Sequence, residues 1–196
     1  GPTVFVCDEA TACRKIGTIG KPVGSMLTRV VDALGADVAP GERGELLIKG
    51  PGVTPGYWNL PEATTAAIQD GWLHSGDIAY VDDDGDYYIV DRAKDMFISG
   101  GENVYPAEVE NVLFQLPEVA EAAVIGTTDA RWGEVGVAMV VVRAGAALDA
   151  DAVIAHCKAK LAGYKVPRHV RFIDVLPRTP SGKVEKHKLR AQFAAH

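Results

Sequence analysis

Apolar and polar residues in the first half of the chain alternate in short runs separated by glycine and proline, a pattern typical of β-strands joined by turns. Residues 26–31 and 44–50 form two such runs, and residues 78–90 predict a β-hairpin with the acidic residues 82–86 at its tip. Residues 61–69 differ, because a leading proline and a closing Asp-Gly pair predict a short helix.

The second half mixes helical and strand patterns. Residues 105–116 carry valine and leucine at i, i+3, i+4 and i+7, which predicts a helix that ends before Pro117. Asp149 is an N-cap residue for a second helix, which places Val153 and Cys157 on one face. The remaining predicted elements are strands at 119–125, 135–142 and 170–175 and a short basic helix at 183–194. The predicted fold class is α+β, with an all-β first part and a boundary near residues 91–94.

Length and composition indicate a globular protein of one domain or two small ones. The chain has 196 residues, of which 47% are hydrophobic and 23% charged, values that argue against disorder. No apolar stretch approaches the roughly 18 residues of a membrane span, and the first residues do not resemble a signal peptide. The three cysteines cannot all pair, so we expect a reducing, cytoplasmic location, with the membrane periphery as a second possibility.

Charge is distributed unevenly along the chain, whose net charge is -6. Residues 1–91 contain 6 basic and 14 acidic residues, whereas residues 157–196 contain 10 basic and 2 acidic ones. A basic end on an acidic chain predicts an anionic partner, with a solvated basic surface as the simpler alternative. Nucleic acid is not the expected partner, because few aromatic residues interleave with these charges and no nucleic-acid motif occurs.

Several common sites are excluded by residue type. Gly182-Lys183 is not a phosphate-binding P-loop, because position 184 is valine where that motif requires serine or threonine. Ser99 lacks the preceding glycine of a hydrolase nucleophile elbow. The acidic run at residues 82–86 resembles a calcium loop in composition, but Asp91 stands where the bidentate glutamate belongs, which favours a plain turn. No metal ligand is predicted.

Three features carry candidate chemistry. Asp77, after a small and flexible Ser-Gly pair, presents a carboxylate suited to vicinal hydroxyls, although residue type alone favours a simple end to a turn. Residues 92–103 place charged residues before the Gly100-Gly101 pair, which allows close backbone approach or simply a tight turn. Residues 177–183 predict a mobile loop that presents Lys183, either for charge neutralisation or as an ordinary surface lysine.

The order and spacing of these features resemble the C-terminal part of acyl-CoA synthetases of the fatty-acid–CoA ligase type, in the adenylate-forming, AMP-binding superfamily. Eight blocks between Gly17 and Arg190 carry the resemblance: residues 44–47, 56–59, 71–77, 91–95, 99–106, 131–134, 164–167 and 177–183. The resemblance implies two domains, 1–93 as the C-terminal β-rich part of the large AMP-binding domain and 94–196 as the small mobile α+β domain.

The resemblance also implies roles for individual residues. Asp77 and Arg92 would bind the ribose and phosphate region of the nucleotide, and Lys183 would be the catalytic lysine that contacts the α-phosphate and the substrate carboxylate. Lys94 would be the hinge between two half-reactions. The implied CoA-binding residues are Gly100, Gly101, Trp132 and Lys165, the last within the basic stretch 165–171. The implied co-substrates are ATP with Mg²⁺, a carboxylic acid and CoA.

One departure limits the expected activity. The family's Ser/Thr/Gly-rich phosphate loop and its aromatic-Gly-x-Thr-Glu block do not occur here, although they hold most of the ATP and Mg²⁺ contacts. We therefore expect a fragment whose partner is a preceding domain of the same protein, and which alone makes no acyl-CoA.

Alternatives differ in the acid and in the acceptor. A medium- or long-chain fatty acid is the preferred substrate on resemblance, with an aryl acid as the alternative. A domain that loads a carrier protein is a second ligase alternative. A stand-alone regulatory or binding module is the non-enzymatic one, to be distinguished by whether the reading frame extends upstream of Gly1.

Overall fold

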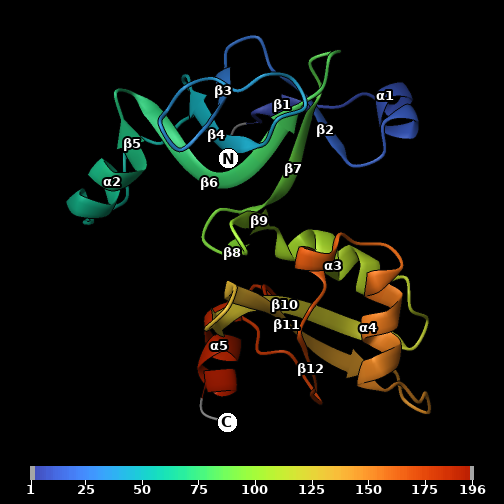
Figure 1. The fold of residues 1–196 in the computed structure, drawn as a ribbon. Coiled ribbons are helices and arrows are strands. Elements are labelled where there is room, and N and C mark those ends of the chain that lie inside the picture. The colour runs from blue at the N-terminus through green and yellow to red at the C-terminus, as the bar shows by residue number, and fades with distance from the viewer. Residues whose placement is uncertain (1–2, 195–196) are drawn as a thin grey trace. The chain divides into compact units, whose positions relative to one another are not determined.

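The computed structural model describes residues 3–194 and divides the chain into two compact units, Gly1–Lys94 and Asp95–His196 (Figure 1). Each unit has its own β-sheet and its own hydrophobic core. The α+β class predicted from the sequence is confirmed. None of the helices within residues 3–194 combines the length and the apolar character that a membrane crossing requires.

The first unit is built on a seven-stranded antiparallel sheet. In spatial order its strands are β1 (Phe5–Val6), β2 (Thr18–Pro22), β7 (Tyr87–Arg92), β6 (Trp72–Val81), β4 (Gly44–Lys49) and β3 (Leu27–Val31), with β5 (Ile68–Gln69) paired to β6. Two short helices, α1 (Glu9–Arg14) and α2 (Pro61–Ala67), lie outside the sheet. The buried core is small, formed by Val30, Leu46 and Ala79 with a few half-buried neighbours.

Two expectations for the first unit require correction. The helix predicted at 61–69 ends at Ala67, because Ile68 and Gln69 pair with β6 as an edge strand instead. Asp77 does not end a turn: strand β6 begins at Trp72 and continues through residues 74–77 to the hairpin. Pairing with β4 on one side and β7 on the other keeps this glycine-containing segment extended.

Within residues 95–194 the second unit contains a five-stranded mixed sheet and three α-helices. Its strands are β8 (Phe97–Ser99), β9 (Glu102–Val104), β10 (Val119–Asp129), β11 (Gly133–Val142) and β12 (His169–Phe172), of which β12 alone runs parallel to its neighbour β11. Its helices are α3 (Pro106–Leu113), α4 (Ala150–Lys158) and α5 (Lys186–Ala194), with a 3₁₀ turn at Gly163–Lys165.

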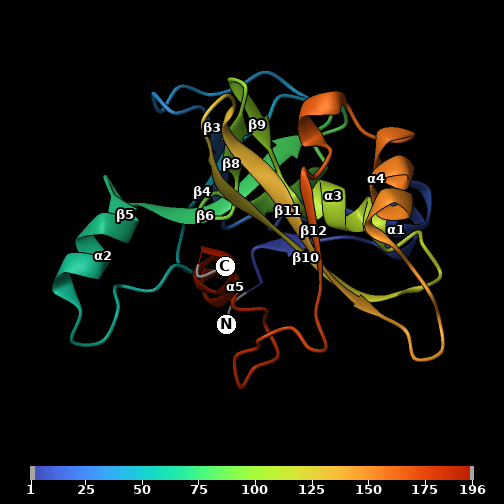
Figure 2. The ribbon, with the colours of Figure 1, turned by 60° about the horizontal axis from the view of Figure 1, so that its bottom comes forward.

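The long strands β10 and β11, whose course Figure 2 shows, contribute side chains to two separate cores. Val124 and Val140 lie in the larger core, to which α3 and α4 contribute. Ile125, which follows Val124, and Met139, which precedes Val140, lie in the smaller core with Leu189 of α5. This is the two-residue alternation of a strand buried on both faces.

Local sequence signals explain most of the helix boundaries. The carboxylate of Asp149 accepts a hydrogen bond from Ala152 N at 2.7 Å, which confirms the predicted N-cap of α4. Pro106 begins α3. The basic helix predicted from residue 183 begins only at Lys186, because Arg178 and Val184 pair as an isolated β-bridge and keep the preceding residues out of the helix. The strand predicted at 170–175 ends at Phe172.

Candidate functional site

Asp77 and Arg92 meet across the hairpin of the first unit. They are directly opposite partners on β6 and β7, and Arg92 Nη1 lies 2.9 Å from Asp77 Oδ1. The Asp77 side chain is 26% exposed and the Arg92 side chain 51% exposed. The backbone also closes here, because Ala93 N donates to Gly76 O at 2.8 Å. The hairpin therefore presents a carboxylate and a guanidinium side by side, within reach of solvent.

An irregularity in β6 shapes this carboxylate. Residues 75–77 lie opposite the single β4 residue Leu46, so the longer strand bulges, and Gly76 has a φ of +69°. Ser75 Oγ donates to Leu46 O at 2.7 Å and accepts from Asp77 N at 3.0 Å. The conformation that carries Asp77 is thus held by hydrogen bonds on both sides of the glycine.

Glu45 and His74 brace the same bulge. Glu45 Oε1 accepts from Gly76 N at 3.1 Å, and Glu45 Oε2 lies 2.8 Å from His74 Nδ1. Sequence reasoning did not single out either residue, although both lie in blocks that carry the family resemblance. The signal that could have found Glu45 is its position in a Gly-Glu pair that begins the strand next to Asp77.

Lys94 lies in the turn after β7 and is exposed. It is the last residue of the first compact unit. Its predicted role as a hinge, and the domain limits 1–93 and 94–196, remain predictions.

Lys183 lies in a closed hairpin of the second unit, not in an open loop. Thr179 N donates to Lys183 O at 2.8 Å, and Gly182 N donates to Thr179 O at 2.8 Å. Arg178 Nη1 donates to Gly182 O at 2.7 Å, and Arg178 Nη2 lies 2.7 Å from Glu121 Oε2 on β10. The mobility expected from its Pro, Ser and Gly content is therefore opposed by a network of hydrogen bonds.

Gly100 and Gly101 form the two-residue turn between β8 and β9, with φ values of +62° and +89°. Gly100 N donates to Trp132 O at 2.9 Å, and a Cβ on Gly100 would lie 2.8 Å from the Trp132 ring. The structure thus brings Gly100 and Trp132, two predicted CoA-binding residues, into contact.

Trp132 is held from several sides. Asp129 Oδ1 accepts from the backbone N–H groups of Trp132 and Arg131 at 2.8 Å each, and these bonds hold the Asp129 pKa below its usual value. The guanidinium carbons of Arg131 and Arg168 lie 4.9 and 5.5 Å from the Trp132 ring centroid. The backbone of Trp132 is therefore held by hydrogen bonds, and two guanidinium groups lie near its ring.

A cleft of about 320 Å³ lies beside Trp132. It is lined by Ser99, Trp132, Val135, Gly163, Tyr164, Val166 and Arg168. Lys165, predicted here as a CoA-binding residue, is not among them, because its ammonium lies 2.6 Å from Glu108 Oε1. Arg168, within the basic stretch 165–171, lines the cleft instead.

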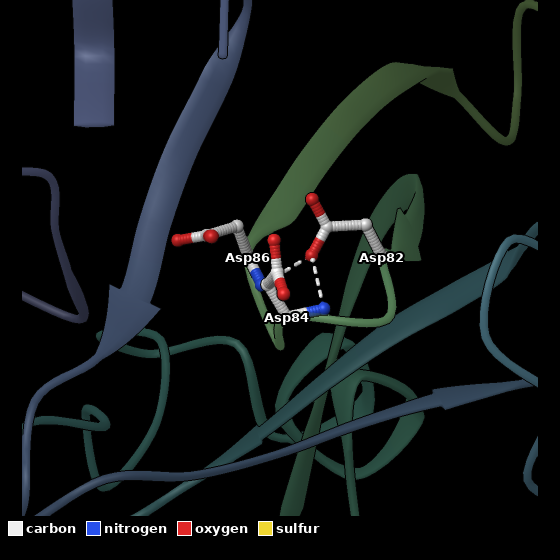
Figure 3. Close-up of side chains that lie close together, drawn as sticks. All are labelled: Asp82, Asp84 and Asp86. Atoms are coloured by element: carbon white, nitrogen blue, oxygen red, sulfur yellow. Dashed lines mark hydrogen bonds between the residues drawn. The ribbon is translucent and has the colours of Figure 1, made fainter. Parts of the chain in front are cut away.

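The acidic hairpin tip is a compact turn whose three aspartate side chains lie close together (Figure 3). Asp82 Oδ1 accepts from the backbone N–H groups of Asp84 and Asp86, and Gly85 has a φ of +82°. The Lys15 ammonium lies 2.7 Å from Asp82 and Asp84 and 2.8 Å from Asp86.

This cluster is the one group within residues 3–194 whose carboxylates lie close enough together to hold a metal ion. The Lys15 ammonium already contacts all three carboxylates. Its hydrogen bonds lower the pKa of Asp82 to about 2, while the three aspartates raise the pKa of Lys15.

Comparison with known protein families and relatives adds to this geometry. The model of the AMP-binding enzyme C-terminal domain matches residues 108–183, and the model of the AMP-binding enzyme matches residues 1–58. The feruloyl-CoA synthase of Amycolatopsis is 52% identical over 98% of this chain, and the indoleacetate–CoA ligase of Aromatoleum aromaticum is 46% identical over 98%. The chain spans 39% and 38% of their lengths.

A solved structure matches both units. The o-succinylbenzoate CoA synthetase of Bacillus subtilis, in complex with the acyl-adenylate intermediate OSB-AMP, superposes with a TM-score of 0.89 at 40% identity. The match covers 98% of this chain and 38% of that protein.

Proposed function

The chain belongs to the AMP-binding, adenylate-forming enzymes and matches their C-terminal part, and on this premise we propose that it forms part of an ATP-dependent acid–CoA ligase. The observation that carries the proposal is its 52% identity with a feruloyl-CoA synthase over 98% of the chain. Because the chain spans 39% of that relative, the activity is proposed for a protein that also contains the remaining part.

The proposed reaction has two steps. A carboxylate oxygen of the acid attacks the α-phosphorus of ATP, which forms the acyl-adenylate and releases pyrophosphate. The thiol of CoA then loses its proton and attacks the acyl carbon, which forms the thioester and releases AMP. Catalysis of this kind depends on positioning and on neutralising charge at the phosphate.

Asp77, Arg92 and Lys183 are the proposed nucleotide-binding residues. The Asp77 carboxylate accepts hydrogen bonds from the two ribose hydroxyls, and the Arg92 guanidinium fixes that carboxylate while adding positive charge. Lys183 neutralises the charge that develops at the α-phosphate in the first step. Support comes from the B. subtilis relative, whose structures hold AMP, or ATP with a magnesium ion.

Mg²⁺ enters this proposal with ATP. Asp82, Asp84 and Asp86 are the described carboxylates that lie close enough together for a metal, but the Lys15 ammonium already lies among all three, so we do not assign the nucleotide's metal to them. We assign no metal ligand among the described residues.

CoA is proposed to bind at the cleft beside Trp132. The indole and the Arg168 guanidinium offer an aromatic face and a positive charge, as a nucleotide requires. Gly100 and Gly101 leave room for the pantetheine arm, and Lys165 adjoins the site, because its ammonium lies 5.6 Å from the ring centroid of the cleft residue Tyr164. The second domain is proposed to rotate at Lys94 between the two steps.

The proposed acid carries an aromatic ring. The fatty acid preferred on sequence resemblance is not supported by the comparisons, which favour the aryl-acid alternative. Feruloyl-CoA synthase, indoleacetate–CoA ligase and 2-succinylbenzoate–CoA ligase are all named for aromatic acids. Assay of the longest gene product that contains this chain, with ferulate, indoleacetate and palmitate, distinguishes the two classes; faster turnover of palmitate would overturn the aryl assignment.

A chimera tests the catalytic proposal directly. The chain replaces the matching segment of the Amycolatopsis feruloyl-CoA synthase, and ferulate-dependent pyrophosphate release and feruloyl-CoA formation are measured. We expect both activities, and we expect Lys183→Ala to lower pyrophosphate release about 100-fold or more. Lys188→Ala, which removes an exposed helix lysine, is the matched control. A folded chimera without either activity would contradict the proposal.

A further inference from the structure

The hairpin that carries Lys183 is fastened to the sheet by one arginine. Arg178 donates through Nη1 to Gly182 O, next to Lys183, and through Nη2 to Glu121 Oε2 on β10, at 2.7 Å in each case. A planar guanidinium has the fork geometry to make both bonds at once. The carbonyl next to Lys183 is therefore tied to a strand of the central sheet.

Both ends of the hairpin are anchored in the smaller core. Leu176, just before it, is 2% exposed, and Val184, just after it, packs against the same core. Glu185 N donates to Pro177 O at 2.8 Å, and Arg178 and Val184 form a β-bridge. The base of the hairpin is thus fixed, and Arg178 with Glu121 restrains its tip.

Hydrogen bonds within the tip complete the restraint. Thr179 Oγ1 accepts from Lys183 N at 3.1 Å and lies 2.9 Å from Ser181 Oγ. Lys183 itself is exposed, so the restraint acts on its backbone while the ammonium stays available. A lysine side chain has many rotamers, so a fixed backbone is what limits the positions that its ammonium can reach.

We propose that Arg178 and Glu121 are positioning residues that hold the Lys183 hairpin in its working conformation, an inference that rests on the proposed role of Lys183 in adenylate formation. Neither residue needs to touch the substrate, because the Arg178 guanidinium is already engaged with Gly182 and Glu121. Their loss therefore slows the first half-reaction and leaves the second unchanged, since Lys183 acts only in the first.

The first test needs no enzymatic activity. In the 196-residue chain, Glu121→Gln removes the charge that holds Arg178 but keeps both tryptic sites in the hairpin. We expect limited trypsin digestion to cut after Lys183 about three- to tenfold faster in this variant, because the hairpin opens more often. Lys188→Met, which breaks the exposed Lys188–Glu185 ion pair, is the matched control and should leave the rate unchanged. An unchanged cutting rate in Glu121→Gln would overturn the restraint.

The second test separates the half-reactions in the feruloyl-CoA synthase chimera. Glu121→Gln and Arg178→Met should lower pyrophosphate release about three- to tenfold and leave CoA consumption from pre-formed feruloyl-adenylate unchanged. Arg178→Lys should not rescue, because a single ammonium lacks the fork that reaches both acceptors. Equal loss in both steps would show a merely structural role and overturn the proposal, as would no loss in either.

The two failures can be told apart. If Lys183→Ala abolishes pyrophosphate release but Glu121→Gln and Arg178→Met do not lower it, the ligase function stands and the positioning role fails. If the unsubstituted chimera is inactive, the ligase function fails and the positioning role fails with it, whatever the trypsin result shows about the hairpin.

Discussion

Lys15 is surrounded by three aspartates and acts as their counter-ion. The cluster is local in space but not in sequence, because Lys15 follows helix α1 while the aspartates form the tip of the β6–β7 hairpin. Asp86 is almost fully buried, and a buried carboxylate requires such a partner. Lys15 thereby connects α1 to the hairpin that carries Asp77 and Arg92.

Lys15→Met should destabilise the chain at neutral pH and much less in acid. The pKa of Asp82 is lowered from 3.8 to about 2, so its ion-pair contribution is complete above about pH 4 and is lost as the pH falls toward 2. We expect the difference in urea midpoint between wild type and variant to narrow over this interval. Arg29→Met, which breaks an ion pair with the exposed Asp37, serves as the control. A difference that stays constant from pH 7 to 2.5 would refute this account.

Individual site residues differed in how far the sequence could identify them. Asp77, Arg92 and Lys183 are predicted as site residues because short motifs of fixed order carry the family resemblance, and their roles stay predictions. Glu45, His74 and Glu121 were missed, because their importance comes from contacts across strands that only the fold brings together. The resemblance implies that Lys165 binds CoA, but its ammonium donates to Glu108, 57 positions away, and it does not line the cleft beside Trp132.

The turn between β8 and β9 lies against Trp132, a proposed CoA-binding residue. Gly100 and Gly101 both have positive φ, but a side chain at Gly100 would collide with Trp132, whereas the space around Gly101 is open. A side chain at either position strains the backbone, but at Gly100 it must also displace the indole of Trp132. Comparing the stabilities of substitutions at the two positions therefore separates these two free-energy costs.

Gly100→Ala and Gly101→Ala form a matched pair. Each should lose about 1 kcal/mol of stability to the left-handed conformation. Gly100→Ala should lose about 1–3 kcal/mol more, because Trp132 must move. Urea denaturation of both variants measures the difference, and in the active chimera Gly100→Ala should raise the KM for CoA more than Gly101→Ala does, because it also displaces Trp132. Equal stabilities of the two variants would show that Trp132 gives way without cost.

The sequence predicted elements best where burial and periodicity agree. Strands β10 and β11 and helices α3 and α4 lie where the apolar patterns placed them, because each buries a long, regular face. The short elements α1, β1, β2, β8 and β9 were not predicted. Among the predicted elements, α5 begins at Lys186, three residues later than expected, and Ile68 belongs to a strand and not to the predicted helix. In both cases a pairing with a distant segment decides the local conformation, and short-range propensity does not encode it.

For the whole molecule, we expect the 196-residue chain alone to show no acid-dependent exchange between ATP and pyrophosphate. The chain spans 39% of the feruloyl-CoA synthase, and its sequence contains no Ser/Thr/Gly-rich phosphate loop. Without that loop, Asp77, Arg92 and Lys183 lack most of the contacts that hold triphosphate. Exchange is measured with labelled pyrophosphate and ferulate, with the Lys183→Ala chain as the blank. Exchange above that blank would contradict the expectation.

The two-faced strands β10 and β11 have a consequence for how this fold can diversify. Neighbouring residues such as Val124 and Ile125 pack in different cores. A change of side-chain volume on one face of the strand is therefore compensated by residues that pack on the same face. The core behind α5 and the lysine hairpin can therefore drift during evolution while the core behind α3 and α4 keeps its own side chains. Alternate residues of this strand pair are thus expected to accumulate substitutions largely independently, because they belong to different cores.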